Sequence, residues 1–250
     1  MSSNRQKSTT IAGILILLGI VAGILSITYA IDDPDYLIKA SASSTSVMVA
    51  AFFHLLMAPI YVGIAISLYP VLKKNNQYLA FGFAAFRIIA SVFIIVGVII
   101  LLLLLTLSQE FVSHGNPDFP YYKTIGGLFQ VGRDLTNHVA TVLAVSFGGL
   151  LFYVLLLRSK LVPRWLSGWG LLGTILTIVA SYLIMFQFIE VISQPYILLN
   201  IPMAVQEIVL GMWLIINGFS NPKNEKLYNK SINRTPITPS SYSSGSAGAG

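Results

Sequence analysis

Residues 78–107 read YLAFGFAAFRIIASVFIIVGVIILLLLLTL, and this stretch decides the class of fold. Its thirty residues hold one charged side chain, Arg87, and show no alternation between apolar and polar positions. About 20 apolar residues are enough for a helix to cross the roughly 30 Å hydrocarbon core of a bilayer. A membrane β-strand is shorter and alternates. The stretch therefore predicts a membrane-spanning helix.

Five further apolar runs accompany it, at residues 10–30, 46–69, 138–157, 165–189 and 196–219. The chain of 250 residues is 55% hydrophobic and 10% charged, whereas an average soluble domain has about 25% charged residues. We therefore expect an all-α, polytopic transmembrane bundle of six helices, in one domain over residues 1–219. The composition excludes a typical cytosolic enzyme, a disordered protein and a nucleic-acid-binding module. The expected partner is the lipid bilayer.

The distribution of basic residues predicts the orientation of the bundle. With the N-terminus in the cytoplasm, eleven Lys and Arg residues fall in cytoplasmic segments and three in outer segments, as the positive-inside rule requires. Six spans then place both termini in the cytoplasm. Residues 220–250 are rich in Asn, Ser, Thr and Pro, which is typical of a disordered tail. Their last part, 243–250, is typical of an added flexible linker.

Ionisable side chains within the spans are the best indication of a functional site. Glu207 lies about 18 Å from the cytoplasmic end of the sixth span, near the middle of the bilayer. Gln206 is its neighbour, and Asn200 and the helix-interrupting Pro202 precede it. Arg87 either lies beside Glu207 or extends to the inner headgroups, because its span is longer than the membrane is thick. We predict a ligand-binding site of Arg87, Asn200, Gln206 and Glu207.

A second polar group lies near the outer ends of the spans. His54 is in the second span, Asp134 and His138 share one face at the start of the fourth, and Glu190 ends the fifth. In one interpretation these four residues line an outer vestibule. In the other they are interfacial side chains that hydrate the helix ends. A haem between the two histidines is disfavoured, because our spans place them at depths roughly 12 Å apart.

The chain carries no recognisable catalytic signature. It has no cysteine and no HExxH, GxSxG or Walker motif. We therefore expect no catalytic residues, no metal site and no cofactor. Gly19 and Gly23 form a GxxxG motif, which is typical of close helix packing either between two copies in an oligomer or within one bundle.

Four stretches carry a resemblance to a known family: Ile11–Ile27, Leu68–Arg87, Leu150–Gly170 and Pro202–Phe219. Together they resemble the bacterial domain-of-unknown-function family 4386, whose members are six-span helical membrane proteins. The resemblance implies the same architecture and a place in the bacterial cytoplasmic membrane. It matches Arg87, His138 and the Gln206–Glu207 pair to the family pattern, and it implies no reaction, substrate or cofactor.

Three classes of function fit these observations. The first is a binding or transport protein for a small solute or ion, with a polar site around Glu207. The second is a structural or accessory membrane protein whose buried polar pair only fixes helix packing. The third is a membrane-embedded enzyme, which would need a nucleophile or metal that the sequence does not supply. A ligand-sized cavity at Glu207 favours the first class, and a solid interior favours the second.

Overall fold

The computed structural model describes residues 2–115, 120–191 and 193–220, and this part of the chain is helical without a strand. The elements are α1 (Ser2–Leu25), α2 (Tyr36–Ala42), α3 (Ser44–Leu72), α4 (Gln77–Ser113), α5 (Pro120–Asp134), the π-helix η1 (Leu135–Thr141), α6 (Val142–Ser159), α7 (Arg164–Met185) and α8 (Gln194–Ile216). Because α5, η1 and α6 are continuous, they count as one span, and six helices are long and apolar enough to cross a membrane. The prediction of an all-α, six-span membrane protein is confirmed.

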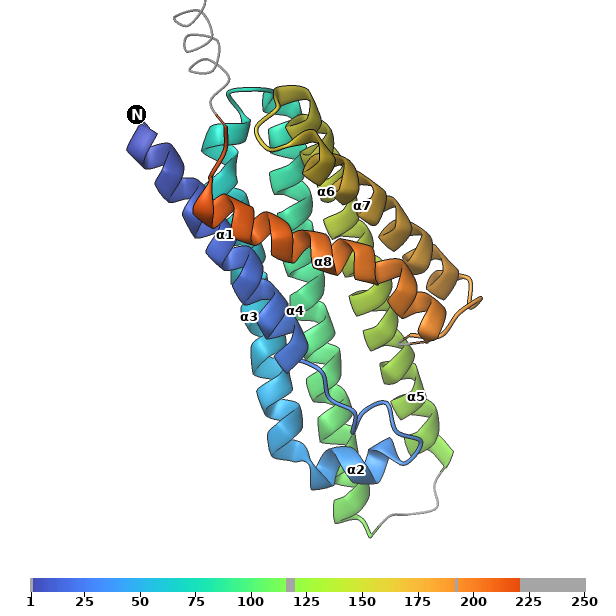
Figure 1. Ribbon diagram of the computed structural model, residues 1–250. Coiled ribbons are helices and arrows are strands. Elements are labelled where there is room, and N and C mark those ends of the chain that lie inside the picture. The colour runs from blue at the N-terminus through green and yellow to red at the C-terminus, as the bar shows by residue number, and fades with distance from the viewer. Residues whose placement is uncertain (1, 116–119, 192, 221–250) are drawn as a thin grey trace, which may run out of the picture.

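The six spans close into a ring. Going round it, α1 packs on α3, α3 on α4, α4 on α6, α6 on α7, α7 on α8, and α8 returns to α1. Figure 1 shows α8 inclined across the other helices. The backbones of α1 and α8 approach each other closely: a Cβ on Gly13 would lie 2.5 Å from the carbonyl oxygen of Gly211. The first and last spans are therefore held together by a backbone contact that only glycine permits.

The helix boundaries differ from the predicted spans at the end of the bundle that carries α2. There α1 stops at Leu25, five residues earlier than expected, and α4 continues to Ser113. The extension is stable because the short helix α2 packs against it: Leu37 and Ala40 are buried in a cluster with Leu104 and Phe111 of α4. The hydropathy of one segment could not show this contact, since it depends on a helix elsewhere in the chain.

The start of α1 and the end of α8 lie together at the opposite end of the bundle, which we call the terminal end (Figure 1). The Arg5 guanidinium donates a hydrogen bond of 2.7 Å to the carbonyl oxygen of Ser220. The amide of Ser220 in turn donates to the carbonyl of Leu161 in the loop between α6 and α7. The expected tail lies, from residue 221 onward, outside the described residues.

Gly19 and Gly23 of the GxxxG motif face another helix of the same chain. A Cβ on Gly19 would lie 3.4 Å from Ile60, and a Cβ on Gly23 would lie 3.7 Å from Met57, both on α3. Small residues here let α1 approach α3 while leaving room between them. That room is the beginning of the candidate site.

Candidate functional site

The two polar neighbours near the middle of α8 have different surroundings. Gln206 is fully buried, accepts a hydrogen bond of 2.7 Å from the Tyr153 hydroxyl, and donates one of 3.2 Å to the carbonyl of Leu166. Glu207 is half-buried and lines a cavity of about 170 Å³. Successive residues on a helix are about 100° apart, so the same helix presents Gln206 to α6 and α7 and Glu207 to the cavity.

The cavity lies between four of the six spans. Its walls come from α1, α3, α4 and α8, and are made by Ile16, Gly19, Ile20, Gly23, Met57, Tyr61, Ile64, Arg87 and Glu207. Most of this lining is apolar or glycine, and the two charges lie within it. The structure thus brings Arg87 and Glu207 to one cavity and leaves Gln206 and Asn200 out of it. The amide of Asn200 donates to the carbonyl of Tyr196 one turn earlier on α8.

Arg87 is held by aromatic rings. Its side chain is 8% exposed, and the guanidinium carbon lies 4.9 Å from the centre of the Tyr61 ring and 5.6 Å from that of Phe83. Cation–π attraction stabilises the charge at such distances, more so away from water. The buried Nε has no hydrogen-bond partner within the described residues. Arg87 is therefore buried among the helices, and its guanidinium nitrogens donate no hydrogen bond to the described residues.

Arg87 and Glu207 do not form an ion pair. In the described ranges, ion pairs join Lys39 to Asp33, and Arg133 to both Asp32 and Asp134. The two charged side chains of the cavity are thus near enough to line the same space and too far apart to neutralise each other directly.

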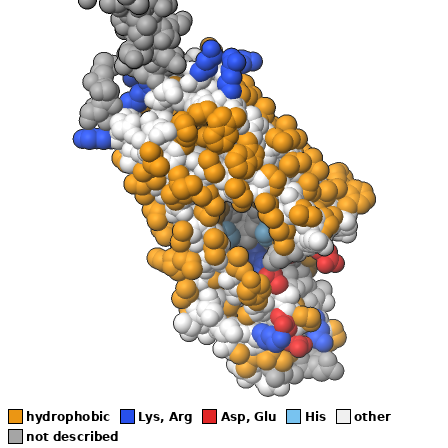
Figure 2. All heavy atoms as spheres, in the orientation of Figure 1, with side chains coloured by type: hydrophobic (Ala, Val, Ile, Leu, Met, Phe, Trp, Pro, Cys, Tyr) orange, Lys and Arg blue, Asp and Glu red, His pale blue; other side chains and the backbone are white. Residues whose placement is uncertain are grey.

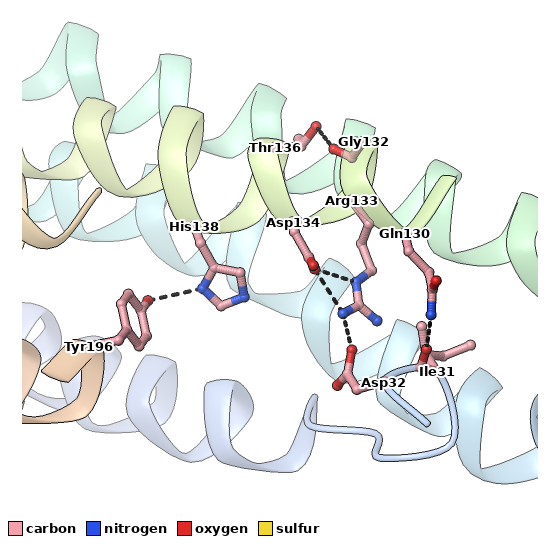
Figure 3. Close-up of polar contacts among 9 residues, drawn as sticks. All are labelled: Ile31, Asp32, Gln130, Gly132, Arg133, Asp134, Thr136, His138 and Tyr196. Atoms are coloured by element: carbon pink, nitrogen blue, oxygen red, sulfur yellow. Dashed lines mark hydrogen bonds and ion pairs between the residues drawn. The ribbon is translucent and has the colours of Figure 1, made fainter. Parts of the chain in front are cut away.

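A second polar cluster lies toward the α2 end (Figure 3). Arg133, at the end of α5, is 7% exposed and binds Asp32 of the α1–α2 loop, and it binds Asp134 at 2.8 Å. Gln130, one turn earlier on α5, donates a hydrogen bond of 2.6 Å to the carbonyl of Ile31. The cluster therefore ties the loop after α1 to the start of the fourth span.

His138 connects this region to α8. Its Nδ1 lies 2.9 Å from the Tyr196 hydroxyl, and its backbone carbonyl accepts a hydrogen bond from Ser181 of α7. His138 lies within η1, and π-helical turns occur frequently at functional sites. One such turn holds an extra residue, so it re-aims the side chains that follow.

The other predicted vestibule residues divide into two groups. His54 is half-buried and near enough to His138 and Arg133 to interact electrostatically with both. Glu190 is exposed in the segment between α7 and α8, and its side chain has no hydrogen bond or ion pair with the described residues. The structure therefore gathers His54, Asp134 and His138 into one region and leaves Glu190 apart from it.

One face of the molecule is hollowed. Figure 2 shows a depression in the face crossed by α8, with histidine and basic side chains visible inside it and acidic side chains at its edge toward the α2 end. On α3, His54, Met57 and Tyr61 follow at intervals of three and four residues and so share one face. Met57 and Tyr61 line the cavity, and His54 is one turn nearer the α2 end. This face of α3 thus runs from the vestibule residues to Arg87.

Outside the membrane-spanning segments, three groups with shifted pKa values lie in α2 and in the loop before it. The Lys39 ammonium donates to the Asp33 carboxylate at 2.5 Å, which lowers the pKa of Asp33 and raises that of Lys39. Burial raises the pKa of the Tyr36 hydroxyl. None of these groups lines the cavity. Within the described ranges, no three His, Asp or Glu side chains come together in a way that could hold a metal ion.

Sequence reasoning missed Tyr61, Tyr153, Asp32 and Tyr196 as site residues. Tyr61 carried a usable signal, because it lies seven residues after His54 and therefore on the same face of its helix. The contacts of Tyr196 and Asp32 join segments 58 and 101 residues apart. No local pattern marks such contacts.

Comparison with known proteins gives one family and no individual relative. The model of the family described as "Domain of unknown function (DUF4386)" matches residues 11–218. No curated protein matches the chain, and no solved structure does.

Proposed function

The chain belongs to the DUF4386 family, and from the cavity between its Arg87 and Glu207 we propose that it binds a small solute or ion within the membrane and transports it. One observation carries the proposal: a buried guanidinium and a carboxylate line the same cavity, and neither has an ionic partner in the described protein. Buried charges are costly unless they are paired or coordinate a ligand. A solute that contacts both side chains supplies the missing interactions.

The route to this site follows from the hollow. His54, Met57 and Tyr61 on α3 lead from the polar cluster at the α2 end to Arg87, a distance of about 10 Å between the first and the last of the three. A solute enters along this face and meets the cavity near the middle of the bundle. Pro202 lies five residues before Glu207 within α8 and removes one backbone hydrogen bond there. Interrupted helices of this kind commonly line transport sites.

We further propose that the terminal end faces the cytoplasm of a bacterial cell. Figure 2 shows Lys and Arg without acidic side chains at that end, while the half toward the α2 end shows both acidic and basic side chains. This is the charge asymmetry of the positive-inside rule.

Impermeant labelling of intact cells tests this orientation. Because the chain has no cysteine, a single thiol can be introduced at exposed Ala42 of α2 or at exposed Lys74 between α3 and α4. We expect Ala42→Cys to react from outside the cell, and Lys74→Cys to react only after lysis. The reverse pattern would contradict the orientation.

Accessibility of the cavity tests the function. Gly19→Cys places a thiol in the cavity wall, while Leu18→Cys places one on the outer surface of α1, where Leu18 is 49% exposed. Both lie about 9 Å or more from the end of α1 at Leu25. We expect a small hydrophilic thiol reagent to modify Gly19→Cys in membranes and to leave Leu18→Cys unmodified, because the lipid-facing thiol meets no water.

Both thiols must react fully after denaturation for this comparison to hold. If Gly19→Cys is as inert as Leu18→Cys in the folded protein, no aqueous path reaches the cavity. That result contradicts transport and favours the structural alternative, in which Arg87 and Glu207 only fix the packing of the helices.

A further inference from the structure

The cavity presents charges of opposite sign to one ligand. Arg87 comes from α4 and Glu207 from α8, two spans that are not neighbours in the ring. Because both side chains line one cavity and do not pair with each other, a ligand in that cavity can contact both at once. The chemical class of the ligand then follows from what each end can recognise.

The Arg87 end recognises an anion. Its guanidinium carbon lies over the rings of Tyr61 and Phe83. The N–H groups of a guanidinium point outward in its own plane. No described group accepts from them. A planar guanidinium held in this way matches a carboxylate through two parallel hydrogen bonds.

The Glu207 end recognises a cation. An ionised carboxylate only accepts hydrogen bonds, and that of Glu207 receives none from the described protein. A purely anionic ligand would pair Arg87 and leave Glu207 unmatched, and a purely cationic ligand would do the reverse. Leaving one charge of a buried pair unmatched is strongly unfavourable.

The remaining wall is apolar. Ile16, Ile20, Met57 and Ile64 surround the two charges, and the cavity holds about 170 Å³. Gly19 and Gly23 keep this volume open, because neither projects a side chain into it. The space suits a molecule of a few carbon atoms whose apolar part contacts these residues.

We propose that the solute is a small zwitterion of the amino-acid class, with its carboxylate on Arg87, its ammonium group on Glu207 and an apolar side chain against α1 and α3. This inference rests on the proposed function and specifies its substrate.

Calorimetric titration of the full-length protein in nanodiscs tests it with matched probes. L-leucine carries both charges, 4-methylpentanoate lacks the ammonium group, and 3-methylbutylamine lacks the carboxylate. Glycine, L-alanine, L-valine and betaine complete the set of zwitterions. We expect at least one zwitterion to bind, and L-leucine to bind about tenfold or more tightly than either single-charge analogue, because each analogue leaves one buried charge unmatched.

Two variants test which charged group of the ligand binds Glu207 and which binds Arg87. Glu207→Gln should abolish the preference for L-leucine over 4-methylpentanoate, and Arg87→Met should abolish the preference over 3-methylbutylamine. The comparison among ligands in the unaltered protein decides the matter even if a variant fails to fold.

The outcomes separate this inference from the function on which it rests. If 4-methylpentanoate or 3-methylbutylamine binds as tightly as L-leucine, or if no zwitterion binds while Gly19→Cys is reactive, the zwitterion proposal is overturned and transport stands. If no probe binds and Gly19→Cys is inert, both proposals fall.

Discussion

Replacing Arg133 with alanine is expected to destabilise the protein by about 2–4 kcal/mol, because it removes the cation that two carboxylates share. Arg133 is buried, whereas Asp32 and Asp134 are about one third exposed at their side chains and keep part of their hydration. Loss of the guanidinium also frees the α1–α2 loop from the fourth span. The measurement is the thermal melting midpoint of the purified protein in detergent.

Lys39→Ala is the matched control for this experiment. Lys39 of α2 pairs with Asp33 of the α1–α2 loop, and the hydrogen bond between them is exposed. An exposed pair contributes little to stability, so the melting midpoint should hardly move. Equal losses for Arg133→Ala and Lys39→Ala would mean that the buried pair does not anchor the loop.

Replacing Gly13 with leucine is expected to destabilise the bundle by about 3 kcal/mol or to prevent its assembly. A Cβ at this position would meet the carbonyl oxygen of Gly211 at 2.5 Å and the backbone nitrogen of Ile215 at 3.2 Å. A backbone cannot rotate away as a flexible side chain does, so α1 and α8 must separate. The cavity loses its shape with them, since both helices line it.

Gly168→Leu in α7 controls for the loss of a glycine from a helix. A Cβ there would have no neighbour within 4 Å. We expect this variant to keep the melting midpoint and the monodisperse elution profile of the unaltered protein. If Gly13→Leu behaves in the same way, α1 and α8 do not make the close contact described.

The number and type of the helices could be predicted because membrane solvation acts on each segment separately. A run such as residues 78–107 must be helical in lipid whatever lies beside it, since each backbone group needs a partner within the segment. The start of the fourth span could not be predicted in the same way. Residues 120–134 are only weakly apolar as a group, and their place is set by contacts of Tyr122 and Arg133 with α2, α4 and the loop before α2.

The candidate site was predicted in part for a related reason. Hydropathy identifies Arg87 and Glu207 as costly residues in lipid, so sequence reasoning named both. It also assigned Gln206 and Glu207 to one site, because the two residues are adjacent in the sequence. On a helix these two residues point to different neighbours, and only the packing of α8 shows that Gln206 meets Tyr153 while Glu207 meets the cavity.

The closed ring has a consequence for biosynthesis. The ribosome releases α1 first and α8 last, yet these two helices must pack on each other and together line the cavity. During translation α1, α3 and α4 are in the membrane with the Arg87 cation, while its opposite charge on α8 is still unmade. Until the final span inserts, the cavity therefore lacks its α8 wall, and Arg87 lies beside a gap that lipid or water must fill.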